Sequence, residues 1–238
     1  MKIALASSFS TSNDIMKNIE TIKDLTIKIE NNIDLVCFGE AFLQGFNALK
    51  WDYNVDKELA VNSSSHYINE IKVIAKNNNI GIGFGFFELL ENAIFCSYMI
   101  INNKGEVVDI YRRVSIGWKE HEKTDHHYKE GNCFNVFSYN GHKIITALCG
   151  DLWYDDNVSK INEIDADIIL WPLHVDYSLK QWNIEKNDYV IQTSKINKPI
   201  LFVNNYSNSS LGGCYLFTNG MIEKELKLGK QGILICIV

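Results

Sequence analysis

The feature that most constrains the fold is a series of short runs rich in Ile, Val and Phe, each of a length typical of a buried strand. Several of them alternate with stretches in which apolar residues recur every three or four positions, as on one face of a helix. The expected strands are residues 2–7, 35–38, 80–87, 97–101, 143–149, 168–171, 200–204, 213–217 and 233–238. The expected helices are residues 14–30, 67–76, 158–164 and 179–196. This pattern predicts an α/β fold with helices on the outer faces of its sheets.

We expect residues 1–238 to form one domain, because the chain has two prolines and no segment resembling a linker. The net charge is −6 and no dense basic patch is visible, so no nucleic-acid partner is expected. No apolar run approaches the roughly 20 residues of a membrane helix, and the first residues do not resemble a signal peptide. We therefore expect a cytoplasmic protein without a membrane partner. Its six cysteines lack paired spacing and should be free thiols.

Three of the expected strands end in residues that can carry chemistry. Glu40 follows the run 35–38, Cys149 ends the run 143–149, and His174 follows the run 168–171. Open α/β sheets bind ligands at the carboxyl ends of their strands, so these side chains are candidates for a common site. Gly150 lets the chain turn sharply, so that backbone N–H groups could face a developing oxyanion. The structural alternatives are a solvated strand end for Glu40 and a packing thiol for Cys149.

Other kinds of site have less support. A Cys149–His174 protease lacks a recognisable residue to orient the histidine. The three histidines at 121, 126 and 127 do not have the spacing of a zinc site, so no metal is expected. The alternating glycines of the run 80–87 are not a dinucleotide-binding motif, and no cofactor is expected.

Four segments carry a resemblance to a known family. They are Phe38-Gly39-Glu40, residues 148–153, residues 166–172 and residues 212–220. Their order and spacing resemble those of the nitrilase superfamily of carbon–nitrogen hydrolases over almost the whole chain. The resemblance implies a four-layer α-β-β-α sandwich that assembles as a homodimer or a higher homo-oligomer. It also implies that Glu40 is the catalytic base and Cys149 the nucleophile.

The chain departs from the family at one position. The family has a catalytic lysine in a Tyr-Arg-Lys-like motif, and here Arg112 is followed by Arg113. Arginine keeps the positive charge, but its planar fork is bulkier and directs its donors differently. Arg113 could take over the role, Lys119 or Lys123 could reach the site instead, or activity could be lost. The chain has 21 lysines and two arginines, both in this motif, which favours a placed arginine at position 113.

The polar segment 111–132 and its neighbours supply further candidates. The family has a second glutamate after the lysine, and Glu120 and Glu122 are the candidates, with Glu122 preferred. Trp118, Trp153, Tyr154 and His174 are expected to line the substrate pocket.

The resemblance predicts a hydrolase that acts on a non-peptide carbon–nitrogen bond of a small amide, carbamoyl compound or nitrile through a cysteine thioester. The alternative is a non-catalytic binding or assembly module of the same fold that has lost the lysine.

Overall fold

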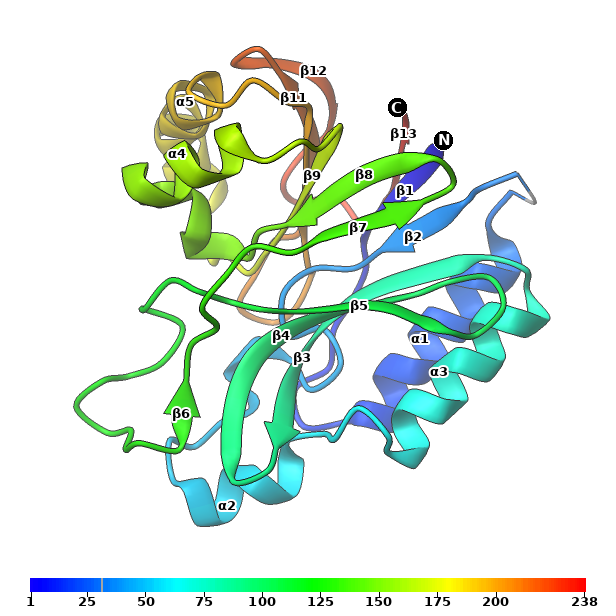
Figure 1. The fold of residues 1–238 in the computed structure, drawn as a ribbon, viewed down its shortest axis with the longest axis vertical. Helices are drawn as coiled ribbons and strands as arrows, with labels where there is room; N and C mark the ends of the chain where they lie inside the picture. Colours follow the sequence, from blue (N-terminus) through cyan, green and yellow to red (C-terminus); the bar gives the residue numbers. More distant parts are fainter. Residues whose placement is uncertain (31) are drawn as a thin grey trace.

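The computed structural model describes residues 1–30 and 32–238, which include two β-sheets stacked face to face (Figure 1). In the first sheet the strand order is β13-β1-β2-β3-β4-β5, and β6 pairs with β4. Its strands are β1 (Lys2–Ser7), β2 (Leu35–Cys37), β3 (Gly81–Leu90), β4 (Ala93–Ile101), β5 (Val107–Arg112), β6 (Tyr128–Lys129) and β13 (Gly232–Ile237). The central strands β1, β2 and β3 are parallel, so their carboxyl ends share one edge.

The second sheet has the order β12-β11-β10-β9-β8-β7. Its strands are β7 (Val136–Tyr139), β8 (His142–Thr146), β9 (Ile168–Leu173), β10 (Ile200–Asn204), β11 (Cys214–Thr218) and β12 (Met221–Leu226). Here β8, β9 and β10 form the parallel centre. Each sheet therefore has a parallel centre with antiparallel strands at its margins.

Helices cover the outer faces of the two sheets. The apolar faces of α1 (Ile15–Lys28) and α3 (His66–Asn77) pack on the first sheet, and those of α4 (Asp155–Glu163) and α5 (Leu179–Ser194) pack on the second. Ser65 and Ser178 cap α3 and α5 by accepting hydrogen bonds from backbone N–H groups of the first turn. The fifth helix is α2 (Tyr53–Leu59). These layers confirm the predicted α-β-β-α sandwich.

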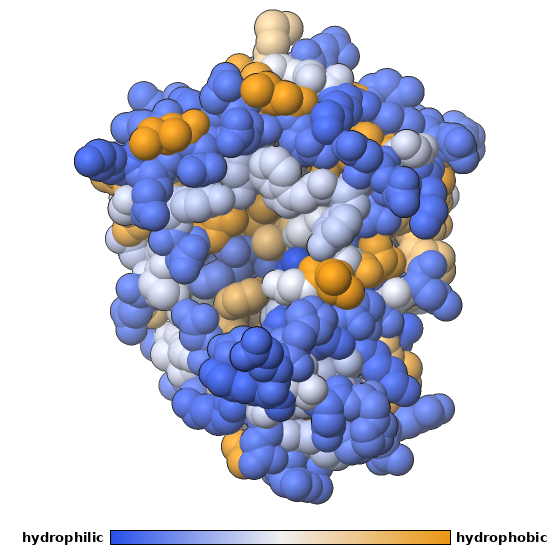
Figure 2. Space-filling view, turned by 90° about the vertical axis from the view of Figure 1, so that its left-hand side faces the viewer, coloured by the Kyte–Doolittle hydropathy of each residue, from blue (hydrophilic) through white to orange (hydrophobic). Residues whose placement is uncertain are grey.

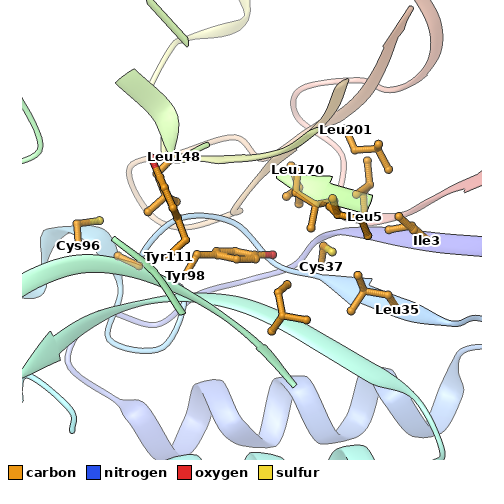
Figure 3. Packing of buried hydrophobic residues seen from close by; sticks show 14 of the residues in the cluster. Ile3, Leu5, Leu35, Cys37, Cys96, Tyr98, Tyr111, Leu148, Leu170 and Leu201 are labelled. Carbon is orange, nitrogen blue, oxygen red and sulfur yellow. The ribbon is translucent and has the colours of Figure 1, made fainter. Parts of the chain in front are cut away.

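The central core lies between the two sheets (Figure 3). Ile3, Leu5 and Leu35 of the first sheet face Leu170 and Leu201 of the second, and all five are almost fully buried. Alternate residues of the same strands face the helices instead, as the two-residue period of a strand requires. Because both faces of the central strands are buried, their sequences are continuous apolar runs rather than alternating ones.

The expected elements match the structure best where a run is buried on both faces. Strands 2–7 and 200–204 have the predicted bounds, and the four expected helices are present with ends shifted by at most three residues. Helix α2 was not among the expected elements, and the expected strand 143–149 ends at Thr146. Seven residues with one buried position carry too little periodicity to indicate a helix.

None of the helices in the described part of the chain is both long and apolar enough to cross a membrane. The cytoplasmic location and the homodimer stay predictions.

Candidate active site

Glu40 lies where the carboxyl end of β2 meets the second sheet. Its backbone N–H donates to the carbonyl of Leu173, 3.1 Å away, and its carbonyl accepts from Asn205 Nδ2 at 2.7 Å. Asn205 Oδ1 also accepts from the N–H of Gly39 at 2.8 Å. A side chain at position 39 would approach this amide to 2.7 Å, so the close approach requires glycine. Glu40 is thereby held at the sheet edge with its carboxylate fully buried.

The cation beside Glu40 is Arg113. Its Nη1 donates to Glu40 Oε1 at 2.8 Å, and both side chains are buried. Arg113 follows β5 directly, and its backbone N–H donates to the carbonyl of Cys96 on the neighbouring strand. The two alternative lysines are engaged elsewhere, since Lys119 pairs with Glu130 and Lys123 pairs with Glu120.

Two further donors hold the Glu40 carboxylate. The thiol of Cys96 donates to Oε1 at 3.3 Å, and the backbone N–H of His174 donates to Oε2 at 3.1 Å. The side chain of Cys96 is buried, and no motif in the sequence marked it as part of the site. The missed contact joins residues 56 positions apart, so no local pattern could indicate it.

Cys149 begins the short 3-10 helix η2 (Cys149–Trp153), three residues after β8 ends. Its φ is 38°, in the left-handed region that residues with a Cβ seldom adopt. The sharp turn therefore lies at the cysteine itself and not at Gly150, to which the sequence analysis assigned it. Trp171 Nε1 donates to the Cys149 carbonyl at 2.8 Å and holds this conformation. The half-buried thiol lies 4.0 Å from the carbonyl oxygen of His174.

The electrostatics of the site keep the sulfur protonated and the guanidinium charged. Burial, and then the negative charge of Glu40, raise the pKa of the Cys149 thiol to about 12, while Arg113 opposes the shift. For Arg113, burial lowers the pKa, but the acidic groups around it, Glu40 foremost, together more than offset this, and the pKa lies above its ordinary value. At neutral pH the nucleophile therefore needs a base to remove its proton.

Asp151 organises the turn that carries Cys149. Its buried carboxylate accepts from Tyr111 Oη at 2.6 Å, from the Ser115 N–H at 2.8 Å and from the Leu148 N–H at 2.7 Å. These donors come from β5, from the segment after Arg113 and from the end of the β8 segment. One carboxylate thus ties the segment that carries the cation to the segment that carries the thiol.

Asp151→Ala should destabilise the protein by about 3–5 kcal/mol, because three donors in a buried site lose their common acceptor. Tyr111→Phe removes one donor and should cost about 1–2 kcal/mol. Urea unfolding followed by fluorescence measures both free energies. A loss below about 1 kcal/mol in Asp151→Ala would show that the network contributes little to stability.

The glutamates of the loop before β7 (Val136–Tyr139) differ in placement. Glu122, the preferred second glutamate, is exposed, and so is Glu120. Glu130 is half-buried and its carboxylate lies 2.8 Å from Lys119 Nζ, whose side chain is 9% exposed. The structure therefore turns Glu130 inward rather than Glu122. The tight pairing with Lys119 could not be predicted because the polar segment has no periodic pattern.

The four expected pocket residues lie in different surroundings. Trp118 is 2% exposed and packs among core aromatic residues, and it also borders a cavity of about 370 Å³. Trp153 packs edge-on against Tyr189 of α5, with the ring centres 4.9 Å apart. Tyr154 borders a cavity of about 520 Å³ together with Ser115. Contact of these side chains with substrate stays a prediction.

His174 stacks on Phe46 with the ring centres 4.4 Å apart, beside a cavity of about 220 Å³. This cavity and the one beside Trp118 share Phe46 and Asn47. Apart from the two rings, the residues around the smaller cavity are small or polar and none is a carboxylate, lysine or arginine: Ser10, Ser12, Gly45, Asn47, Ser207, Asn208 and Ser209. Figure 2 shows the face of the molecule to the left in Figure 1, which is hollowed across its middle.

Burial lowers the pKa of His174 from 6.5 to about 4, so the folded protein keeps its ring neutral. Protonation then favours the unfolded chain. The contribution of the neutral His174 ring to the unfolding free energy is complete above pH 6.5, and it is lost as the pH falls from 6.5 to about 4. The difference in unfolding free energy between wild type and His174→Phe should shrink over this range. A difference independent of pH would contradict a neutral buried histidine.

Three potential metal ligands gather away from Glu40 and Cys149, on the segment before β6. The ligand atoms of Asp125, His126 and His127 lie within 4.8 Å of one another, and the first two side chains are exposed. His127 Nδ1 lies 2.9 Å from Asp125 Oδ1, and its ring stacks on Tyr53. The absence of a metal from the site stays a prediction.

The sequence and the fold are similar to those of known proteins. The chain is 25% identical to the deaminated glutathione amidase of Dictyostelium discoideum, over 82% of this chain and 74% of that protein. It is 23% identical to the glutamine-dependent NAD(+) synthetase of Aquifex aeolicus, over 76% of this chain but only 32% of the synthetase. The chain thus spans about a third of that larger relative.

Solved structures show the same fold. One structure of the amidase from Nesterenkonia sp. AN1, whose active-site cysteine carries the product of a Michael addition of acrylamide, matches with a TM-score of 0.83. The match covers 100% of this chain and 93% of the amidase at 16% identity. The model of the carbon-nitrogen hydrolase family matches residues 2–236. The chain therefore belongs to the carbon-nitrogen hydrolase family.

Proposed function

We propose that the protein hydrolyses a small amide or a related carbon–nitrogen bond through a thioester on Cys149. The observation that carries this proposal is the buried ion pair of Glu40 and Arg113 beside a half-buried thiol at the meeting edges of the two sheets. Burying a carboxylate and a guanidinium is costly, and a scaffold without catalysis gains little from such a pair next to a cysteine.

The first half of the reaction forms the thioester. Glu40 takes the proton of Cys149, and the sulfur attacks the carbonyl carbon of the substrate. The negative charge that develops on the oxygen is stabilised by the guanidinium of Arg113 and the backbone N–H of Gly150. The carbon–nitrogen bond then breaks, and ammonia or an amine leaves with the proton that Glu40 took.

The second half releases the acid. Glu40 removes a proton from water, and the hydroxyl oxygen attacks the thioester carbon. The carbon–sulfur bond breaks, a carboxylic acid leaves, and the proton returns to the Cys149 sulfur. Glu40 thus acts in both halves, which suits a carboxylate held by donors on both of its oxygens.

The proposal is tested with small aliphatic amides, ω-amides of dicarboxylic acids, carbamoylated amines and nitriles. We expect release of ammonia or amine with at least one of these classes, and intact-mass spectrometry should detect an acyl adduct that maps to Cys149. Binding of these compounds without an adduct or a product would instead support a non-catalytic module. An adduct on another cysteine would overturn the assignment of the nucleophile.

A further inference from the structure

The groups around residue 113 are positioned to bind the guanidinium of an arginine. Nε of Arg113 donates to Ser115 Oγ at 2.8 Å, and Nη1 donates to Glu40 at 2.8 Å. Ser115 is 4% exposed, so its hydroxyl lies inside the protein beside the guanidinium. These two acceptors fix the plane of the guanidinium, because they bind two of its three nitrogens.

The third nitrogen, Nη2, lies over Gly150. A Cβ atom built on Gly150 would lie 2.4 Å from Nη2, 3.0 Å from Ser115 Oγ and 3.3 Å from Arg113 Cζ. Gly150 has no positive φ, so its backbone does not require glycine. A methyl group there would instead displace Nη2 from its position. Among the hydrogen bonds of the described residues, none uses Nη2, which leaves this nitrogen available beside Cys149.

We propose that Ser115 and Gly150 adapt this active site to an arginine: Ser115 is a positioning residue that orients the guanidinium, and Gly150 admits it next to the nucleophile. This inference rests on the proposed function, because it assigns Nη2 of Arg113 as a donor to the developing oxyanion. Arg113, Ser115 and Gly150 then act together in the active site.

A lysine at position 113 could not make the contacts that Arg113 makes with Ser115 and over Gly150. Its side chain has no donor at the Nε position, so the Ser115 hydroxyl loses its partner. Its Nζ reaches about as far as the arginine Cζ, so the atom that excludes a side chain from position 150 is absent. Arg113→Lys should therefore retain a cation beside Glu40 and some turnover, and it should tolerate a methyl group at position 150.

The test is a double-mutant cycle of kcat with Gly150→Ala and Arg113→Lys. Alanine keeps the backbone N–H of residue 150, so the substitution acts by displacing the guanidinium. Gly150→Ala should lower kcat by about 10²-fold in the wild-type protein, the order expected for loss of one oxyanion donor. In the Arg113→Lys protein the same substitution should change kcat by less than about threefold.

A second double-mutant cycle measures the contribution of the Ser115 hydroxyl to kcat. Ser115→Ala should lower kcat about tenfold with arginine at position 113 and leave it unchanged with lysine, whereas KM changes little in both. Ser97→Ala is the matched control, because Ser97 is a buried serine whose hydroxyl donates at 2.8 Å to Glu88, the ion-pair partner of Arg112, rather than accepting from Arg113. It should leave kcat unchanged.

Equal effects of Gly150→Ala in the arginine and lysine proteins would overturn the inference and leave the proposed function standing. If the wild type turns over none of the substrates, the proposed function fails instead, and the first cycle is measured on urea midpoints. Gly150→Ala should then lower the midpoint more in the arginine protein than in the lysine protein, because the clash does not depend on catalysis. Equal shifts of the urea midpoint in the two proteins would contradict the proposed adaptation of Ser115 and Gly150 to Arg113.

Discussion

Cys149→Ala is expected to abolish hydrolysis, with a loss of kcat of about 10⁵–10⁶-fold, as found when a catalytic nucleophile is removed. The acyl adduct should disappear with it, because no other thiol of the site is placed to replace Cys149. The thiol of Cys96 also contacts Glu40, but it is 1% exposed. Steady-state kinetics together with intact-mass spectrometry measure the two losses separately.

The control for this experiment is Cys133→Ala. Cys133 is an exposed free cysteine, and its removal should leave both turnover and the adduct unchanged. The folding of Cys149→Ala should be nearly unaffected, because the alanine keeps the left-handed backbone and the Trp171 hydrogen bond to the carbonyl. Product release at the wild-type rate from Cys149→Ala would remove the thioester from the mechanism.

Arg113→Ala is expected to lose both stability and turnover. Glu40 is 0% exposed, and removal of its cation leaves a buried carboxylate that keeps, among the described residues, two donors, the Cys96 thiol and the His174 N–H. Breaking a buried pair in this way costs about 3–5 kcal/mol of unfolding free energy. Loss of the oxyanion donor should lower kcat by at least about 10²–10³-fold.

Arg113→Lys separates these two losses. It keeps a charge beside Glu40, so urea unfolding should show a much smaller destabilisation than for Arg113→Ala. Its kcat should lie between those of the wild type and Arg113→Ala, because the cation is kept but the hydrogen bond to Ser115 is lost. If Arg113→Ala retains full kcat under conditions where it is folded, the oxyanion must be stabilised by another group.

The strands that lead to Glu40 and Cys149 were predictable from the sequence. Continuous apolar runs indicate strands buried on both faces, and a charged residue or a thiol at the end of such a run stands out against them. The resemblance of the Tyr-Arg-Arg motif to that of the family also made Arg113 a candidate for the cation, with Lys119 and Lys123 as the alternatives. These signals are local, because they depend on residues that follow one another in the chain.

The contacts within the site were not predictable in this way. Arg113 and Glu40 are separated by 73 positions, and Asn205 reaches Gly39 across 166. Glu130 and the two other loop glutamates lie in one polar segment, and only the folded chain shows which one turns inward. Trp118 has the sequence surroundings of a pocket residue, yet most of its ring is inside the core.

The sequence by itself determined the α/β class, the strands that lead to Glu40 and Cys149, and the candidacy of Arg113. Periodicity and residue type decide these features, since burial of apolar faces is the dominant force in folding. Only the tertiary structure decided which acceptors hold the guanidinium, which atoms lie over Gly150 and which cation lies beside Glu40. Packing of two sheets brings distant residues together, and interactions at about 3 Å depend on that packing rather than on neighbours in the chain.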